Sequence, residues 1–301
     1  MKQKHLLICL LTGLFTAPFV GASAATITVD VIATFDYPGA VTTYAEEINN
    51  NNEIAGFAET DTAGFGFIRA ANGQFSEPLI DPEDTHMRTV VSGLNDSGTL
   101  CGSFWGADSV HGFFLSDGTY TTYDVPGESY TDVTGINNAG DFVGTYFDPV
   151  ISFQGFISVG GTVTTIDIPG GTYITPNGIN TANQLVGSYV DAASGFSYGF
   201  YSSPTGKLTY PIHVPGSLTT YLHGINDRGW MVGNYWTQSG HRRTGHGLLF
   251  IAPNQFVTVD YAGSSDVVLT GINHKGLICG WYTDSNNKVH GLVARAQRTA
   301  E

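Results

Sequence analysis

A tripeptide of the form Gly-Ile-Asn, or a close variant of it, recurs six times along this chain of 301 residues. In each repeat a glycine follows the asparagine by seven residues, and successive repeats lie 46, 42, 43, 46 and 47 residues apart. The asparagines are Asn49, Asn95, Asn137, Asn180, Asn226 and Asn273, and the glycines are Gly56, Gly102, Gly144, Gly187, Gly233 and Gly280. A period in the forties with four short strands per unit is typical of a β-propeller. Because every repeat carries the pattern, it predicts an architecture and indicates no chemistry.

The third repeat shows the predicted strands of one blade, here named A to D. Residues 131–136 alternate as strand A and end at an Asn-Asn-Ala-Gly turn, and residues 141–147 follow as strand B. Strand C is predicted at 155–158 and strand D at 162–168. The repeat glycine in strand B predicts that a neighbouring backbone or ring comes close there.

The two ends of the repeat region predict how the ring closes. After Gly291-Leu292-Val293 no fourth strand follows, whereas a surplus strand at 29–37 precedes the first repeat. We therefore expect an all-β, six-bladed propeller of four-stranded antiparallel blades, in which the N-terminal strand completes the last blade and removes two free sheet edges. The predicted propeller domain covers 25–301. Blade one departs furthest from the repeat, at 47–49 and at 77–80.

The N-terminus has the pattern of a cleaved signal peptide. Lys2 and Lys4 precede an apolar run from residue 6 to about residue 20, and Ala22-Ser23-Ala24 forms a small-x-small cleavage site. This predicts a signal peptide at 1–24 and a secreted or periplasmic product with no membrane segment after cleavage. The formal charge is −14, and it becomes −16 without the two lysines. A field of that sign excludes nucleic acid and anionic lipid as partners.

Two cysteines follow the predicted signal peptide, Cys101 and Cys279. Each stands immediately before the repeat glycine, where other repeats have valine or alanine. Equivalent positions two blades apart should be farther apart than the roughly 7 Å between Cα atoms that a disulfide tolerates. We expect two buried free thiols.

The repeat resembles the HAF family of extracellular repeats, which is named for a His-Ala-Phe motif at strand C. The motif stands here as His111-Gly112-Phe113, His246-Gly247-Leu248 and His290-Gly291-Leu292. The resemblance covers essentially the whole chain after the signal peptide, together with the Gly-Ile-Asn, Val-Gly-x-Tyr and Asp-x-Pro-Gly signatures. It implies a secreted bacterial repeat protein, and it brings no established catalytic residues.

The candidate binding face is the one that carries the B-to-C loops and the D-to-A connections, because these vary in length on a rigid scaffold. Blade five departs from the consensus there, with Trp236, His241, Arg242, Arg243 and His246 in one loop. Arginine forks bind carboxylates, and tryptophan offers a flat apolar surface on which sugars lie. The candidate ligand-binding residues are Trp236, His241, Arg242, Arg243, His246, His213, His223, Trp105 and Trp281. The alternatives are a solvated basic loop and plain aromatic packing.

Other chemistries have less support in the sequence. No spacing forces His213, His223, His241 and His246 together as metal ligands, so no metal site and no cofactor are predicted. Calcium has no loop motif either, and the aspartates that precede x-Pro-Gly are expected to cap turns. We therefore expect a non-catalytic, monomeric binding propeller whose partner is a glycan or an extracellular protein. The alternative is a propeller-type glycosidase or polysaccharide lyase, although no Asp or Glu stands apart from the repeat pattern in a way that indicates a catalytic pair of carboxylates.

Overall fold

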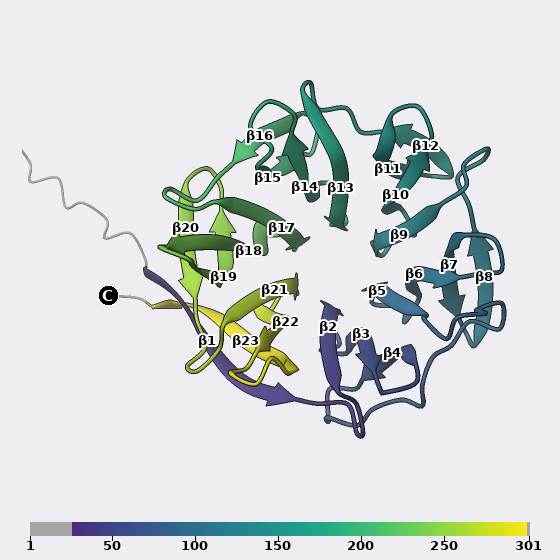
Figure 1. The fold of residues 1–301 in the computed structure, drawn as a ribbon, viewed down its shortest axis with the longest axis horizontal. Coiled ribbons are helices and arrows are strands. Elements are labelled where there is room, and N and C mark those ends of the chain that lie inside the picture. The colour runs from purple at the N-terminus through teal and green to yellow at the C-terminus, as the bar shows by residue number, and fades with distance from the viewer. Residues whose placement is uncertain (1–25, 300–301) are drawn as a thin grey trace, which may run out of the picture.

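The computed structural model describes residues 26–299, so the signal peptide predicted at 1–24 lies outside the described residues. Within that range the chain forms 23 strands and no helix, and hence contains no helix that could span a membrane. Six antiparallel sheets stand like blades around one axis, with strand A of each blade innermost (Figure 1). The prediction of a six-bladed all-β propeller is confirmed.

The strands follow the chain blade by blade. Blade one contains β2 (Thr42–Ile48), β3 (Ile54–Glu59) and β4 (Gly64–Arg69). Blade two contains β5 (Val90–Leu94), β6 (Leu100–Trp105), β7 (Val110–Ser116) and β8 (Thr119–Tyr123). Blade three contains β9 (Thr131–Ile136), β10 (Phe142–Asp148), β11 (Ser152–Val159) and β12 (Thr162–Thr165).

The remaining blades keep the same order. Blade four contains β13 (Gly171–Ile179), β14 (Leu185–Asp191), β15 (Ser197–Ser202) and β16 (Leu208–Ile212). Blade five contains β17 (Thr219–Ile225), β18 (Trp230–Ser239), β19 (Arg242–Ile251) and β20 (Gln255–Val259). Blade six contains β21 (Asp266–Ile272), β22 (Leu277–Thr283), β23 (Val289–Thr299) and the N-terminal β1 (Thr26–Phe35).

Blade one differs from the others in its outer edge. Instead of a fourth ladder, the segment after β4 makes three isolated bridges, Gly66 with Leu79, Arg69 with Phe75 and, in parallel, Gly64 with Arg88. The stretch lacks strand alternation, and Pro78 has no N–H to donate to a ladder. Phe75 packs instead against the rings of Phe67 and Tyr37. The irregular edge is therefore held by aromatic packing.

Ring closure occurs as the chain ends predict. The last sheet has the order β1-β23-β22-β21, and β1 pairs antiparallel with β23 from Thr26↔Thr299 to Phe35↔Gly291. In Figure 1 the two ends of the described chain lie side by side at this blade. Ile27 of β1 is 7% exposed and belongs to the core cluster of blades five and six. The N-terminal strand thus contributes apolar contacts as well as the outer ladder.

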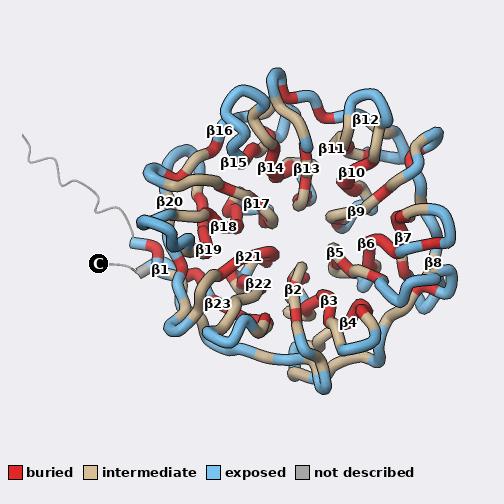
Figure 2. The backbone as a smooth tube through the Cα atoms, in the orientation of Figure 1, coloured by how far each residue is buried: buried red, intermediate tan, exposed pale blue. Residues whose placement is uncertain are grey.

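The core lies between neighbouring blades, because the clusters of buried apolar side chains join residues of adjacent blades. In Figure 2 the exposed segments are mostly the outer strands and the loops. The repeat glycine of strand B accounts for part of this packing. A Cβ on Gly144 would lie 2.2 Å from the carbonyl oxygen of Asp132 and 2.8 Å from the ring of Phe156. Both a backbone and a ring come close, so this prediction is confirmed. The strand-C residues packed in this way are fully buried in four blades, at Phe67, Phe113, Phe156 and Phe200.

The repeat asparagines join into a closed ring of hydrogen bonds. Each Asn Nδ2 donates to the backbone carbonyl of the equivalent asparagine one blade further on, at 3.0–3.3 Å, and Asn273 donates to Asn49 to complete the circle. Each Oδ1 also accepts from two backbone N–H groups of its own turn, as Asn137 does from Ala139 and Asp141. The repeat asparagine therefore ties each A-to-B turn to the next blade, which explains why it recurs in every blade.

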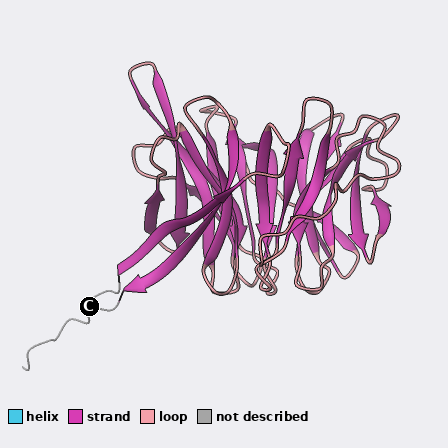
Figure 3. Cartoon of the chain, turned by 90° about the horizontal axis from the view of Figure 1, so that it is seen from below, coloured by secondary structure: helices cyan, strands magenta, loops and turns pink. Residues whose placement is uncertain are grey.

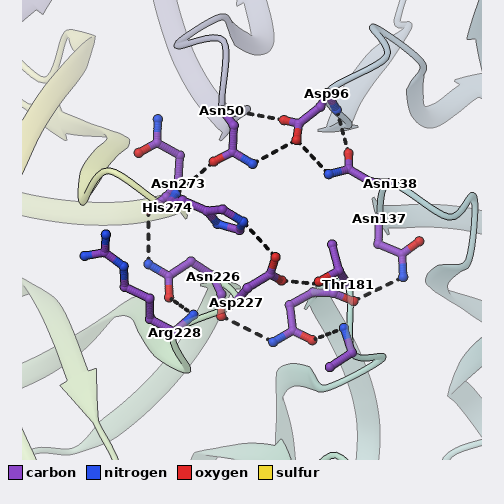
Figure 4. A network of polar contacts seen from close by, with 12 residues as sticks. Asn50, Asp96, Asn137, Asn138, Thr181, Asn226, Asp227, Arg228, Asn273 and His274 are labelled. Atoms are coloured by element: carbon purple, nitrogen blue, oxygen red, sulfur yellow. Dashed lines mark hydrogen bonds and ion pairs between the residues drawn. The ribbon is translucent and has the colours of Figure 1, made fainter.

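A second polar ring follows at the mouth of the axis, made by the residues next to these asparagines (Figure 4). Asn50 donates from its backbone and its side chain to Asp96, at 2.7 and 2.8 Å, and Asn138 Nδ2 donates to Asp96 at 2.6 Å. Burial alone would raise the pKa of Asp96, but these hydrogen bonds lower it below the ordinary value. His274 Nε2 lies 2.8 Å from Asp227 Oδ2 on the opposite side. These side chains bind one another around a hollow of about 60 Å³ at this mouth.

Cys101 and Cys279 are both free and buried, as predicted. They lie in blades two and six, with blade one between them. Burial raises the pKa of both thiols well above the ordinary value, so neither is a nucleophile at neutral pH.

Candidate ligand-binding groove between blades four and five

The two faces of the ring differ in their connections. Strand directions place the A-to-B and C-to-D turns on one face, named here the turn face, and the B-to-C loops and D-to-A connections on the other, named the loop face. Figure 3 shows short turns of similar length along one edge and uneven loops along the other, where one hairpin projects beyond the rest. β18 and β19 each run for ten residues and pair as far as Ser239↔Arg242, which identifies that hairpin as theirs.

A groove of about 660 Å³ lies on the loop face between blades four and five. One wall is the B-to-C loop of blade four, and the other is the β18–β19 hairpin with the start of β17. It is lined by Gly195, Phe196, Ser197, Leu218, Thr219, Tyr221, Trp236, Gln238 and Arg243.

Aromatic side chains come into the groove from both blades. Phe196 of blade four is 46% exposed, although a large apolar side chain is normally covered. Trp236 near the end of β18 is half-buried, and its neighbour Tyr235 is buried in the core between blades. Alternation along the strand turns the two rings to opposite sides of the blade, so Tyr235 packs in the core while Trp236 lies beside Gly245 and lines the groove. Tyr221 extends the aromatic lining toward the central axis.

Polar groups accompany these rings. The exposed guanidinium of Arg243 lines the groove and forms no ion pair with any residue in 26–299. The Thr219 hydroxyl is buried at the groove wall and lacks a hydrogen-bond partner among the described residues. Gln238 Nε2 donates to the carbonyl of Gly240 at 2.9 Å and so steadies the hairpin tip. A concave site with aromatic walls and a few polar groups has the general composition of a small-ligand site.

The structure brings together part of the predicted set. Trp236 and Arg243 line the groove, while His241 and Arg242 lie exposed at the tip of the same hairpin.

His246 lies in the same hairpin but is held by other groups. Its Nδ1 lies 2.7 Å from Asp260, its Nε2 lies 3.0 Å from the Thr237 hydroxyl, and its ring stacks on Tyr235. Blades two and six repeat this arrangement with His111 and Asp124 at 3.0 Å and with His290 and Asp36 at 2.8 Å. The strand-C histidine therefore links strand C to the end of strand D in three blades. Asp36 and Asp124, which precede x-Pro-Gly, and Asp260, which precedes Tyr-Ala-Gly, therefore accept from histidines, rather than capping the turn as expected from the sequence.

The other predicted residues lie apart from the groove. His213 lines a separate hollow of about 350 Å³ with Pro211 and Phe250. Trp105 is 46% exposed on blade two, next to His86. Trp281 packs edge-on against Tyr44 between blades six and one, at 5.4 Å between ring centroids.

His223 lies in the central channel. The innermost strand of every blade has a β-bulge three residues before the repeat asparagine, and the bulged residues line a cavity on the axis of about 110 Å³. They are Glu46, Ser92, Thr134, Asn177, His223 and Thr270. His223 Nε2 lies 2.9 Å from Asn234 Oδ1, and burial lowers the pKa of the ring, so His223 is neutral at pH 7.

Blade one places two glutamates in this cavity. Glu47 stands where the other five blades have glycine, and its Oε1 accepts from the backbone N–H of Ile48 at 2.8 Å. Burial raises the pKa of Glu46 and of Glu47 to about 8, with nearby Asp132 adding to the shift of Glu46. Both carboxyl groups therefore bind protons more tightly in the folded protein than in the unfolded chain.

These raised pKa values predict that stability falls as the solution becomes alkaline. The contribution of each glutamate is fully present below the unfolded-state pKa near 4.5 and is lost as the pH rises through about 8. The urea midpoint should therefore decrease between about pH 5 and pH 9. A Glu46→Gln, Glu47→Gln double variant should flatten this dependence, whereas Glu77→Gln on the surface should retain it. An equally steep profile in the double variant would show that other groups cause the loss.

Sequence reasoning missed several groove residues and the channel glutamates. Phe196 belongs to the B-to-C loop of blade four and Ser197 begins β15, while Thr219 and Tyr221 belong to the first strand of blade five. Pairing the loop of each blade with that of the next would have placed them beside Trp236. The signal for Glu47 was a charged residue in a glycine position of the repeat.

Comparisons with known proteins give the fold. No family model matches the chain, and no curated protein is similar to it, so the HAF resemblance stays a prediction. Aleuria aurantia lectin, a mutant in complex with Fucα1-6GlcNAc, is 11% identical with a TM-score of 0.54, covering 86% of this chain and 92% of the lectin. A mutant of AofleA from Arthrobotrys oligospora is 10% identical with a TM-score of 0.54, covering 92% and 91%. TolB from Acinetobacter baumannii is 10% identical with a TM-score of 0.51, covering 80% of this chain and 63% of TolB.

Proposed function

We propose that this protein is a secreted, non-catalytic carbohydrate-binding propeller, and that the glycan lies in the groove between blades four and five. The observation that carries the proposal is the groove itself, where Trp236 and Phe196 face an open space of about 660 Å³ with Arg243 and Thr219 at its walls. Flat aromatic surfaces and hydrogen-bonding groups together suit a pyranose ring, which has apolar faces and a polar edge. That one of the similar structures is a lectin bound to a fucosylated disaccharide is consistent with this proposal.

An enzymatic role has less support from the groove. Glycoside hydrolysis uses two carboxyl groups beside the scissile bond, and the groove lining contains none. Glu46 and Glu47 lie in the axial cavity instead. No group of three or more His, Cys, Asp or Glu within residues 26–299 is arranged to hold a metal ion. Export, the monomeric state and the absence of a cofactor stay predictions.

The proposal is tested by screening purified protein on a glycan array and by measuring reducing ends released from the bound polysaccharides. We expect binding without turnover. Trp236→Ala should weaken binding of the best ligand about fivefold or more, because stacking on an aromatic ring contributes on the order of 1 kcal/mol or more beyond area burial. Trp105→Ala is the matched control, since Trp105 occupies the equivalent position of strand B in blade two and is exposed outside the groove. Equal affinity of the Trp236→Ala variant would reject the groove.

A further inference from the structure

The arginine of the groove differs from its counterpart elsewhere on the loop face. Arg88 lines a hollow of about 340 Å³ near blade one, but Glu59 lies in the same hollow and its carboxylate is 3.7 Å from the Arg88 guanidinium. Arg243 has no such partner within residues 26–299, and no Asp or Glu lines its groove. The groove therefore presents an uncompensated positive charge.

This charge is unusual for the molecule as a whole. The chain has 26 acidic residues against 12 Lys and Arg, and its formal charge is −14. Two of the few cations, Arg242 and Arg243, are nevertheless adjacent on one hairpin beside His241. A local positive region in a negative field favours an anionic group at that place and repels it elsewhere on the surface.

Two carboxylates near the groove walls, Asp191 and Asp266, bind groups other than Arg243. Asp191, at the end of β14, accepts from the backbone N–H and the hydroxyl of Ser194, both at 2.7 Å, and these bonds lower its pKa. Asp266 packs near Gly245 in the first strand of blade six and accepts from the Ser265 hydroxyl at 3.4 Å. Neither side chain lines the groove, so the Arg243 guanidinium is available to a ligand.

We infer that the ligand bound in the groove is an acidic glycan, whose sugar carboxylate pairs with Arg243 while a pyranose face lies on Trp236. This inference rests on the proposed function and names its ligand class. A guanidinium presents two parallel N–H donors that match the two oxygens of a carboxylate. The adjacent aromatic rings bind the apolar face of the same sugar unit or of the next one.

The test uses a panel of uronic-acid oligosaccharides, each paired with its methyl ester, together with neutral oligosaccharides of the same length. Esterification removes the negative charge and keeps the sugar backbone. We expect at least one free acid to bind about ten- to a hundredfold more tightly than its ester, as charge-assisted hydrogen bonds do relative to neutral ones. Arg243→Gln should abolish that difference. Arg242→Gln is the matched control, because it removes the same charge one residue away from the groove lining. This variant should retain most of the difference in affinity between the acid and its ester.

Each outcome separates this inference from the function on which it rests. Two outcomes would overturn the acidic ligand and leave the glycan groove in place. One is equal binding of acids and esters, and the other is preferential binding of neutral sugars that is still lost in Trp236→Ala. Selectivity for acids that persists in Arg243→Gln would overturn the role of Arg243. If no oligosaccharide of the panel and no glycan of the array binds, both proposals are overturned.

Discussion

A shortened chain that begins at Asp36, and so lacks β1, is expected to lose much of its stability and to associate with other copies. β1 supplies the outer ladder of blade six and buries Ile27, with Val29 and Val31 packed against the same cluster. Fully burying one such side chain contributes about 1.5–3 kcal/mol, so the loss is on the order of 5 kcal/mol before the ladder is counted. That is comparable with the whole stability of many domains, about 5–15 kcal/mol.

This expectation is checked by urea unfolding and by size-exclusion chromatography. The unpaired edge of β23 should recruit a strand from another molecule. A synthetic peptide of residues 26–35 added in trans should restore the midpoint, because it supplies the missing strand, whereas a scrambled peptide should not. A shortened chain that unfolds at the same urea concentration as the full chain would show that closure by β1 contributes little.

Replacing a repeat asparagine is expected to be the most destabilising single substitution on the turn face. Asn137 is 3% exposed, and its side chain makes four hydrogen bonds. Asn137→Ala would leave two backbone N–H groups without their partner, each at a cost of about 1–3 kcal/mol when buried, and would remove one of the two donors to the Asn180 carbonyl. We expect a loss of about 4 kcal/mol in the free energy of unfolding, measured by urea titration.

The matched control is Asn72→Ala. Asn72 lies exposed in a turn of blade one, where its Oδ1 accepts from the backbone of Gln74, and surface changes of this kind cost less than about 1 kcal/mol. Comparable losses in the two variants would contradict the role assigned to the asparagine ring.

The architecture could be predicted because its determinants are local and repeated. The Asn turn and the strand-B glycine each indicate a local feature of one blade, and each recurs six times. The unequal chain ends indicate how the ring closes. The irregular outer edge of blade one could also be predicted from local signals, namely Pro78 and the lack of strand alternation. What the repeat does not show is the hydrogen-bonded ring of asparagines, because that depends on the distance between neighbouring turns.

The site could be predicted only in part, for a geometric reason. Trp236 and Arg243 stand out as departures from the repeat, but Phe196 belongs to another blade and is brought opposite them by the ring. His246 looks like one more departure from the repeat. Like His111 and His290, however, it binds an aspartate at the end of strand D, and only three-dimensional contacts reveal this pair. Glu46 faces the channel because a bulge redirects its side chain, which alternation along a strand cannot predict.

Nuclear magnetic resonance of the tryptophan indole N–H groups can show whether the glycan lies in the groove between blades four and five. The chain has four tryptophans, and single Trp→Phe variants would assign each signal. During titration with the glycan that binds best, we expect the signal of Trp236 to shift in proportion to saturation while that of Trp105 stays in place. A shift of the Trp105 or Trp281 signal with an unmoved Trp236 signal would contradict it and place the ligand on another blade.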